Sequence, residues 1–472
     1  MKMRMTAALA IAAMGPVALS DTITVGPNFV DYDYITITAA IANAVSGDEI
    51  LIQPGLYAEN LAVIDKDLTL RNAGGGVVTV FGQDLDKCFR STGTSTDVVL
   101  DGLTFTRGFS TSAGGGVSIE GGSRATIVDC VIEDSNSTSF GGGLYMSGGG
   151  TVTNTIIRNN TSLSNGGGMD LRGTVLKTFV DCVIEGNEGV EGGGVSYSGA
   201  GVIASFEGCR FIGNTASVRG GAIAVLGNSL RGDLQVRTCW FEENRGETAG
   251  GAVWVSDQDV FQAINSVFVR NSAGTDGGAI RNEQLVELIQ CTLYENSVDS
   301  MAAGTLSTTR SDGVTRLYNS IVVNQAATSH SGTGVYSRSY SILPEAPTGS
   351  PDANGNFDAN PMFADAAGDD FRLMAGSPAI DAANSRGEYN AGGGFMVEIL
   401  DLMTDYNGDV RNLDDPATGN TGVSAWELCI DMGAFEFQPS GASDCPADLT
   451  GDGVLNFFDV SAFLSAYNAG CP

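Results

Sequence analysis

A glycine cluster that recurs along the middle of the chain limits its fold more than any other feature of the sequence. Two or three glycines followed by apolar residues occur seven times, beginning at Gly114, Gly141, Gly166, Gly192, Gly220, Gly250 and Gly277. The intervals between them are 27, 25, 26, 28, 30 and 27 residues. Such a period is typical of stacked repeats, in which one unit alone cannot bury its apolar face. Seven copies favour chain corners over a phosphate-binding loop.

A second motif recurs on the same period and alternates like a β-strand. It consists of a small residue, any residue, a large apolar residue, two further residues and an asparagine. Copies begin at Thr155, Cys182, Cys209, Cys239, Ser266, Cys291 and Asn319, and Cys130 opens another in which Ser135 takes the asparagine position. Because alternate side chains of a strand share a face, the large apolar residues predict one inner stack: Ile132, Ile157, Ile184, Phe211, Phe241, Phe268, Leu293 and Ile321.

These motifs predict an all-β chain folded as a parallel β-helix of roughly twelve turns. The intervals lack an apolar stripe of helical period, which argues against alternating strands and helices. The asparagines would form a hydrogen-bonded ladder at one bend, through Asn160, Asn187, Asn214, Asn244, Asn271, Asn296 and Asn324. An amphipathic helix over Ile35–Val45 would cap the open first turn.

Composition restricts the partners of the chain. Fifty-five acidic residues against 24 basic ones give a formal net charge of -31, which repels nucleic-acid phosphates. We therefore expect no nucleic-acid partner. The single histidine, His330, excludes zinc sites built from several histidines. Its Ser/Thr/Gly-rich surroundings predict a loop.

Residues 1–20 have the composition of an export signal. Lys2 and Arg4 precede an apolar run, and small residues around Ala18 precede the expected cleavage before Asp21. A transmembrane anchor is the alternative, but the uncharged stretch is shorter than the roughly 20 residues that span a bilayer. We expect a secreted, extracellular or cell-surface protein with no transmembrane segment in the mature chain.

The repeats resemble those of polymorphic outer-membrane proteins and other secreted right-handed β-helix proteins. Residues 36–61 resemble the capping start of the pectate-lyase-like fold, and residues 360–384 with 431–437 are similar to the tail that closes many bacterial β-helix surface proteins. The resemblance implies a right-handed parallel β-helix with an N-terminal helical cap over residues 21–340. A closing tail associated with surface anchoring would follow over 341–440, and a separate module over 441–472.

Pectin-degrading relatives on this fold use carboxylate clusters on an outer face of the coil. Here the outward residues of consecutive turns include Asp129, Glu133, Arg158, Asp181 and Glu185. Carboxylates two turns apart would lie ~9.6 Å from each other, near the upper limit for an inverting glycosidase pair. The alternative is a solvated ladder of alternating charges, which we favour because no lyase or polygalacturonase signature accompanies the cluster. We assign no catalytic residue.

Nine cysteines in an exported chain suggest disulfides. Five of them, Cys130, Cys182, Cys209, Cys239 and Cys291, share one stacked inner position that Thr155, Ser266 and Asn319 also fill. This substitution pattern favours small buried side chains. A bridge between neighbouring turns stays open as the alternative, although in-register stacking gives it poor torsion.

The last 32 residues contain a twelve-residue calcium loop from Asp448 to Asp459, with Gly453 at its sixth position. The predicted ligands are Asp448, Thr450, Asp452, Asn456 and Asp459 through side-chain oxygens, and Val454 through its carbonyl. Asp459 replaces the usual glutamate and Thr450 is neutral, so the affinity is expected to be lower. The acidic segment Asp405–Asp409 lacks a glycine at the sixth loop position and the rest of the calcium loop, which predicts a turn.

The C-terminal segment resembles a dockerin, in a short form bracketed by cysteines. The resemblance implies docking to a cohesin-like or surface-anchoring protein, although a full dockerin carries two calcium loops and only one is visible. A segment this short needs a metal and a covalent staple to fold, which predicts bound Ca²⁺ and a disulfide between Cys445 and Cys471. The expected protein is a structural or polysaccharide-binding surface rod, and the alternative is a polysaccharide lyase or glycoside hydrolase acting on the outer face of the coil.

Overall fold

The computed structural model describes residues 20–199, 203–227, 233–256, 258–299, 304–323, 328–348, 350–385, 404–411, 413–423 and 430–438. Residues 1–19 of the export signal and the whole calcium module lie outside the described residues. Ca²⁺ binding by Asp448, Thr450, Asp452, Val454, Asn456 and Asp459 therefore stays a prediction, as does the disulfide between Cys445 and Cys471.

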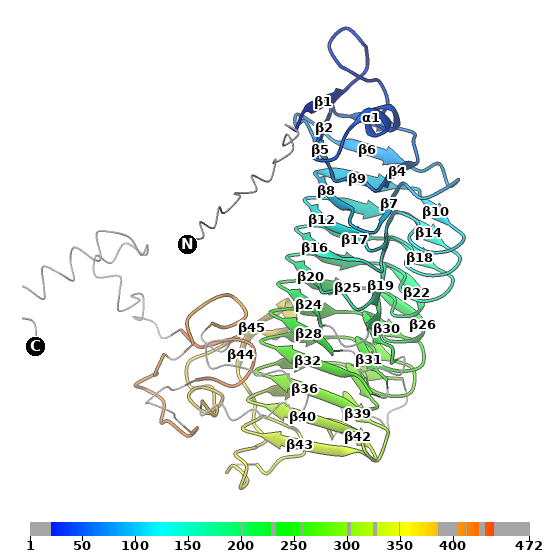
Figure 1. Cartoon of the computed structure of the whole chain (residues 1–472). Helices are drawn as coiled ribbons and strands as arrows, with labels where there is room; N and C mark the ends of the chain where they lie inside the picture. Colours follow the sequence, from blue (N-terminus) through cyan, green and yellow to red (C-terminus); the bar gives the residue numbers. More distant parts are fainter. Residues whose placement is uncertain are drawn as a thin grey trace, which may run out of the picture.

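The chain winds into a parallel β-helix of about 11 turns, seen from the side in Figure 1. Four parallel sheets, which we name A to D, run along the coil and contain 13, 11, 11 and 8 strands. From β8 to β39 each turn crosses sheets A, B, D and C in that order. The predicted all-β parallel coil is confirmed.

The strands of sheet A are β1 (Thr22–Val25), β2 (Glu49–Ile52), β5 (Leu68–Asn72), β8 (Asp97–Asp101), β12 (Arg124–Val128), β16 (Gly149–Thr153), β20 (Lys177–Val180), β24 (Ile203–Glu207), β28 (Asp233–Arg237), β32 (Val260–Ile264), β36 (Leu285–Ile289), β40 (Val314–Tyr318) and β43 (Val335–Ser339). Those of sheet B are β3 (Gly55–Tyr57), β6 (Val78–Phe81), β9 (Leu103–Thr106), β13 (Val131–Glu133), β17 (Ile156–Arg158), β21 (Val183–Glu185), β25 (Arg210–Ile212), β29 (Trp240–Glu242), β33 (Val267–Val269), β37 (Thr292–Tyr294) and β41 (Ile321–Val323).

The strands of sheet C are β4 (Leu61–Ile64), β7 (Phe89–Gly93), β11 (Val117–Gly121), β15 (Leu144–Met146), β19 (Met169–Gly173), β23 (Val195–Gly199), β27 (Ile223–Val225), β31 (Val253–Val255), β35 (Ile280–Asn282), β39 (Leu306–Thr308) and β42 (His330–Gly332). Those of sheet D are β10 (Phe109–Ser110), β14 (Asn136–Ser137), β18 (Thr161–Ser162), β22 (Glu188–Glu191), β26 (Thr215–Arg219), β30 (Arg245–Gly246), β34 (Ser272–Ala273) and β38 (Ser297–Val298).

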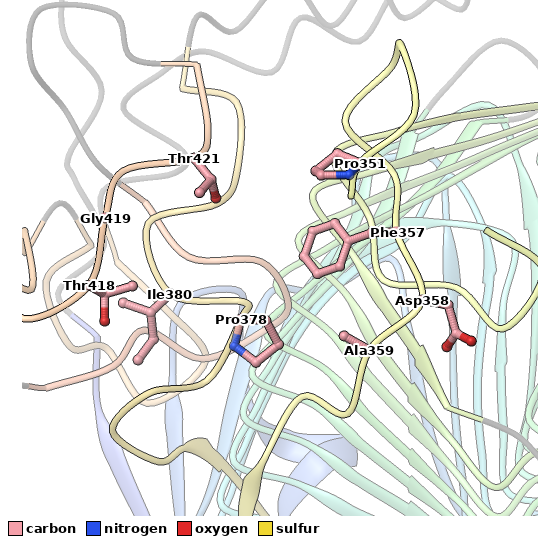
Figure 2. A pocket seen from close by; sticks show the side chains of 9 residues that line it. All are labelled: Pro351, Phe357, Asp358, Ala359, Pro378, Ile380, Thr418, Gly419 and Thr421. Atoms are coloured by element: carbon pink, nitrogen blue, oxygen red, sulfur yellow. The ribbon is translucent and has the colours of Figure 1, made fainter. Parts of the chain in front are cut away.

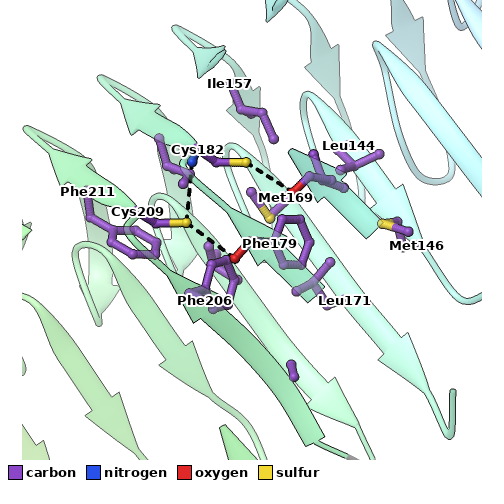
Figure 3. Packing of buried hydrophobic residues seen from close by; sticks show 14 of the residues in the cluster. Leu144, Met146, Ile157, Met169, Leu171, Phe179, Cys182, Phe206, Cys209 and Phe211 are labelled. Atoms are coloured by element: carbon purple, nitrogen blue, oxygen red, sulfur yellow. Dashed lines mark hydrogen bonds between the residues drawn. The ribbon is translucent and has the colours of Figure 1, made fainter. Parts of the chain in front are cut away.

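Apolar side chains stack inside the coil from one turn to the next, as the repeats predict. The rings of Phe211 and Phe241 lie 4.6 Å apart at an interplanar angle of 1°, and Phe268 continues the stack at 4.5 Å. A second stack joins Phe179 of β20 to Phe206 of β24 at 4.5 Å (Figure 3). All five rings are buried. The coil interior is thus a set of columns of like side chains.

The predicted stack is wrong by one residue at its last member. Leu293 of β37 pairs with Val322 of β41, whereas Ile321 pairs with Thr292 and faces outward. The corresponding small position is Ser320, whose Oγ accepts a hydrogen bond from the N–H of Cys291. Both Asn319 and Ser320 are small polar residues, so the motif alone did not distinguish the two registers.

The asparagine ladder is present at the bend between sheets B and D. The side chain of Asn160 donates to Oδ1 of Asn187 at 3.1 Å. The same bond recurs in the next pairs: Asn187 to Asn214, Asn214 to Asn244, Asn244 to Asn271 and Asn271 to Asn296. These asparagines are buried, and the ladder satisfies polar groups that a bend inside the coil would otherwise leave unpaired. Asn324 lies outside the described residues.

The glycine clusters form the corner before sheet C. The first glycine of every cluster has a positive φ, from 60° at Gly141 to 70° at Gly192. A Cβ on Gly115, the second glycine of its cluster, would come within 2.3 Å of a main-chain oxygen of the next turn. The corner therefore requires glycine for its backbone conformation and for the close approach of neighbouring turns.

A short helix, α1 (Ile37–Asn43), lies within the range predicted to be helical. Thr36 accepts from the N–H of Ala39, and the carboxylate of Glu59 accepts from the N–H groups of Ile37 and Thr38 at 3.0 and 2.8 Å. These bonds satisfy the free donors at the start of the helix. The helix packs against β1, β2 and β4; its role as a cap stays a prediction.

Beyond the coil, the chain turns back and packs along the outside of sheet B (Figure 1). We call residues 360–438 the tail; it contains η1 (Ala366–Gly368) and the antiparallel pair β44 (Phe363–Asp365) and β45 (Asp370–Leu373). Trp240 of β29 contacts the rings of Phe371 and Tyr406, with centroids 5.9 and 5.7 Å away. The main-chain N–H of Ala434 donates to Thr292 on β37. Within the described residues, no helix is both long and apolar enough to cross a membrane.

Candidate functional site

Three of the five outward residues that the sequence analysis weighed as a carboxylate site form one ion-paired ladder. Glu133, Arg158 and Glu185 are aligned on the neighbouring strands β13, β17 and β21. Nη2 of Arg158 lies 2.7 Å from Oε2 of Glu133, and Nη1 lies 3.8 Å from Oε1 of Glu185. One guanidinium therefore serves both carboxylates, and the interpretation as a charge ladder is confirmed.

The other two candidates, Asp129 and Asp181, lie at the corner between sheets A and B. Both have a positive φ, 53° and 52°. Nδ2 of Asn154, one turn further along, donates to Oδ1 of Asp129 at 2.6 Å. The five candidates are thus divided between a strand face and a corner rather than gathered in one site.

Asp181 lines a polar cavity of about 340 Å³ between this corner and a turn of the tail, with Thr238 and Asp405 among its other lining residues. The Asp405 carboxylate accepts main-chain N–H bonds from Asn407, Asp409 and Glu436 at 2.8 to 2.9 Å. Burial raises the pKa of Asp405. The bonds from Asn407 and Asp409 close Asp405–Asp409 into the predicted turn. The Asp405 carboxylate is therefore engaged inside the protein.

Charged residues on the outer face of sheet C are likewise paired with their neighbours. The guanidinium of Arg172 lies 3.6 Å above the ring of Phe140, and its Nε donates to the buried Asp170. Arg219 lies 3.9 Å above Trp254 in the same way and also binds Glu191. These contacts join the corner of sheet D to sheet C and hold the side of the coil together.

The tail contains a second ionic cluster, which is fully buried. Arg411 donates to Glu436 at 3.3 Å, to Asn265 at the corner before β33, and to the carbonyl of Gly433 at 2.8 Å. Burial and the neighbouring Glu436 raise the pKa of Asp431 well above its usual value. Unpaired buried charge is costly, so this cluster fixes the tail against the coil rather than offering an open site.

The prediction that His330 lies in a loop is wrong. His330 begins β42 and pairs with Leu306, whose side chain points into the coil. Its ring stacks on Tyr336 with centroids 4.3 Å apart, and Nε2 lies 2.9 Å from Oγ1 of Thr308. Burial lowers the pKa of His330 to about 4. The surrounding small polar residues carry no apolar alternation, so the sequence did not mark this strand.

The six described cysteines are free buried thiols. The N–H of Cys182 donates to Sγ of Cys209 at 3.4 Å, so the two are stacked without a bridge. Burial raises the pKa of Cys130 to about 12, which keeps this thiol protonated and unreactive at neutral pH. The alternative of disulfides within this inner column is therefore wrong.

A mostly apolar cleft lies where the end of the coil meets the tail (Figure 2). It has a volume of about 370 Å³. Its lining residues come from two segments that face each other: Pro351, Phe357, Asp358 and Ala359 on one side, and Pro378, Ile380, Thr418, Gly419 and Thr421 on the other. The Phe357 ring points across the gap toward Ile380 and Thr418 (Figure 2). We call this the Phe357 cleft.

The sequence did not identify this cleft. Pro378 and Ile380 belong to the tail segment that carries the family resemblance, but nothing in that segment indicated a partner. Phe357 is a single aromatic residue in a turn-rich stretch that contains Gly355 with a φ of 79°. The one signal in the sequence that could have pointed to the cleft was this aromatic residue among turn residues.

Among the residues that the structure describes, no group of three or more His, Cys, Asp or Glu side chains could hold a metal ion. The predicted calcium ligands are not part of that set.

Comparisons with known proteins identify the coil. A family model described as a right-handed β-helix region matches residues 66–241, which agrees with the observed topology. The crystal structure of pectate lyase Pel9A is similar over 89% of this chain and 97% of its own, with 16% identity and a TM-score of 0.48. A pectin methylesterase from Aspergillus niger is similar over 61% and 90%, with 16% identity and a TM-score of 0.31. No curated protein matches the chain.

Proposed function

We propose that the protein is an exported, surface-associated rod with a structural or carbohydrate-binding role, attached or sorted through a calcium-binding, dockerin-like C-terminus. We favour polysaccharide binding over polysaccharide cleavage because Arg158 binds both Glu133 and Glu185. A glycosidase needs one carboxyl group that holds a proton and a second that is free to attack or to activate water. Here one guanidinium engages both carboxylates, so neither is free for such a role.

The carbohydrate-binding part of this proposal is supported by the resemblance of the repeats and of the C-terminal segment. A rod of parallel sheets offers long outer faces of regularly spaced side chains. Helix α1 would cap its N-terminal end, and the tail would separate the rod from the anchoring module.

The test of recognition against cleavage uses the mature chain and a panel of neutral and acidic polysaccharides, with and without Ca²⁺. We expect retention on at least one polysaccharide without release of reducing or unsaturated ends. A robust cleavage that Glu133→Gln or Glu185→Gln abolishes would favour the alternative of a lyase or hydrolase. The control is Asp97→Asn, which removes a carboxylate from β8 of sheet A and should leave cleavage unchanged.

Calcium binding is tested by calorimetric titration of the mature chain. The six predicted ligands between Asp448 and Asp459 form one site, so we expect one Ca²⁺ to bind and Asp448→Ala or Asp459→Ala to abolish the heat. Mass spectrometry without reduction tests the disulfide between Cys445 and Cys471. If the chain binds no Ca²⁺ at millimolar concentration, the calcium module is wrong. The proposed docking then loses its support.

A further inference from the structure

We propose that the outer face of sheet A over β32, β36 and β40 is a docking surface for residues 386–403 of the same chain. We call this surface the sheet A docking face; its apolar side chains are Val260, Ile264, Leu285, Ile289, Val314 and Tyr318. Residues 386–403 lie outside the described residues, whereas the face and the residues at both ends of the segment are described. The proposal depends neither on carbohydrate binding nor on the calcium module.

The outward side chains of this face are buried, although no described apolar side chain from outside sheet A packs on them. Ile264 and Ile289 are 1% and 0% exposed. They point away from the coil interior, since their neighbours Ala263 and Leu288 belong to the main core. Among the described residues, their apolar cluster contains only one further member, Tyr318 of the next strand. A single sheet does not bury both of its own faces, so another segment must cover this one.

The earlier turns of sheet A are open at the same strand position. Glu207 of β24 and Arg237 of β28 precede Ile264 in this column, and both reach solvent. The column becomes apolar and buried together, from Ile264 to Ile289. Sequence and burial therefore change at the same turn, as expected where a surface passes from solvent to a covering segment.

Both ends of the segment are fixed at the edge of this face. Asn265, directly after β32, donates from Nδ2 to the carbonyl of Thr404 at 2.7 Å. Asn319, directly after β40, donates to the carbonyl of Asn384 at 3.0 Å and accepts from its N–H at 2.9 Å. Strands two turns apart are separated by about 9.6 Å, whereas residues 386–403 would reach about 60 Å if extended. The segment therefore has enough length to cross the face and return.

The corner residue between these two anchors has an unpaired amide. Gln290 follows β36 and is 0% exposed, and neither its Nε2 nor its Oε1 has a hydrogen-bond partner among the described residues. Its counterparts in the neighbouring turns, Asn265 and Asn319, both bind main-chain groups of the tail. Because an unpaired buried amide is costly, a peptide segment that passes over β36 would give Gln290 the same kind of partner.

The composition of the segment fits an apolar face. Most of its second half is apolar: Phe395, Met396, Val397, Ile399, Leu400, Leu402 and Met403. Because both of its ends are already held at the face, its effective concentration there exceeds that of a second copy. The shorter segment 424–429 is a weaker candidate, since its flanking residues Val423 and Ile430 are bonded to Ala383 within the tail. A docked segment makes this part of sheet A unavailable to a polysaccharide.

The first experiment is photo-cross-linking of the mature chain that carries Tyr318→p-benzoylphenylalanine. The substitution keeps an aromatic ring at the partly buried edge of the face. We expect mass spectrometry to locate the cross-link within residues 395–403. The matched control is Val180→p-benzoylphenylalanine, at the same strand position on β20, which should give no cross-link to this segment. A cross-link to residues 424–429, or to a second copy in a dimer-sized band, would overturn the proposal.

The second experiment measures the rate at which chymotrypsin cleaves after Phe395. Ile289→Arg places an unpaired charge on the docking face, so we expect cleavage at least about tenfold faster than in the wild type, because proteolysis follows the population of the undocked segment. Val180→Arg should leave the rate unchanged. The rates are compared if Ile289→Arg retains a native circular dichroism spectrum, and the cross-link decides if it does not. Equal rates in the three folded proteins would show that the segment is not docked on this face.

Discussion

Arg270, at the corner after β33, is paired with Asp369 of the tail, with Nη1 2.6 Å from Oδ1 and Nη2 2.9 Å from Oδ2. The two residues are 99 positions apart in the chain. These two contacts form a specific polar link between the coil and the tail, and the pair lies next to the apolar contact of Trp240 with Phe371.

Removal of this pair should loosen the tail without unfolding the coil. We expect Asp369→Asn to lower the stability of the tail by about 0.5–1 kcal/mol, because the pair is partly exposed to solvent. Hydrogen exchange of peptides from residues 360–385 and 430–438 should become faster, while peptides from the coil keep their protection. Arg372→Ala is the matched control because it breaks the local pair with Asp370; equal acceleration in both variants would contradict the role of Asp369.

The phenylalanine stack should dominate the stability of the middle turns. Phe241 lies between Phe211 and Phe268 at 4.6 and 4.5 Å, so Phe241→Ala would leave a cavity against two neighbours. We expect a loss of about 3–5 kcal/mol in denaturant unfolding followed by fluorescence. Phe241→Leu should cost less because it fills most of the space. Unchanged stability in the alanine variant would show that the ring is not a core residue.

The asparagine ladder should tolerate serine better than alanine. Asn214 accepts from the side chain of Asn187 and donates to Asn244 and to the carbonyl of Ile184. Asn214→Ala leaves these groups unpaired in the interior, at a cost of about 1–3 kcal/mol for each one that water cannot reach. Asn214→Ser should recover part of that loss because Ser135 occupies the ladder naturally, with its N–H bonded to Asn160. The check is the thermal midpoint of both variants; identical midpoints would exclude a hydrogen-bonding role for the ladder.

A buried lysine should make the stability of the rod depend on alkaline pH. Lys177 of β20 is 2% exposed and donates to the carbonyls of Arg172 and Val175. Burial lowers the pKa of Lys177 to about 8, below the value of about 10.4 of an unfolded lysine. Between these values the unfolded chain binds more protons, so stability rises with pH through this window.

The expected effect at pH 7 is a penalty of about 3 kcal/mol from the charged form of Lys177. Lys177→Met should therefore stabilise the protein at pH 7, and its advantage should shrink as pH rises from 8 toward 10. The measurement is the denaturation midpoint against pH. Lys87→Met is the control, since Lys87 is buried beside Glu120 at 2.8 Å and its loss should destabilise. An advantage of Lys177→Met that does not change with pH would contradict the prediction.

The sequence by itself determined the coil. The repeated positions of Phe211 and Phe241, the asparagines from Asn160 to Asn296 and the first glycines of the clusters all lie where the period places them. The physical reason is that stacking puts equivalent residues of neighbouring turns in the same surroundings, so a regular pattern in the chain becomes a column in the structure. The predicted register was wrong at Ile321, because the adjacent small residues Asn319 and Ser320 fit the motif equally well.

The tertiary structure alone decided what lies outside the period. The return of the tail to Trp240, the pairing of Asp369 with Arg270, and the position of Phe357 opposite Ile380 join segments that share no repeat. His330 likewise became an inner strand residue because sheet C continues past the last clear motif. Contacts of this kind depend on where irregular backbone passes over a finished coil. Local alternation and spacing do not encode that path, whereas they do encode the strands beneath it.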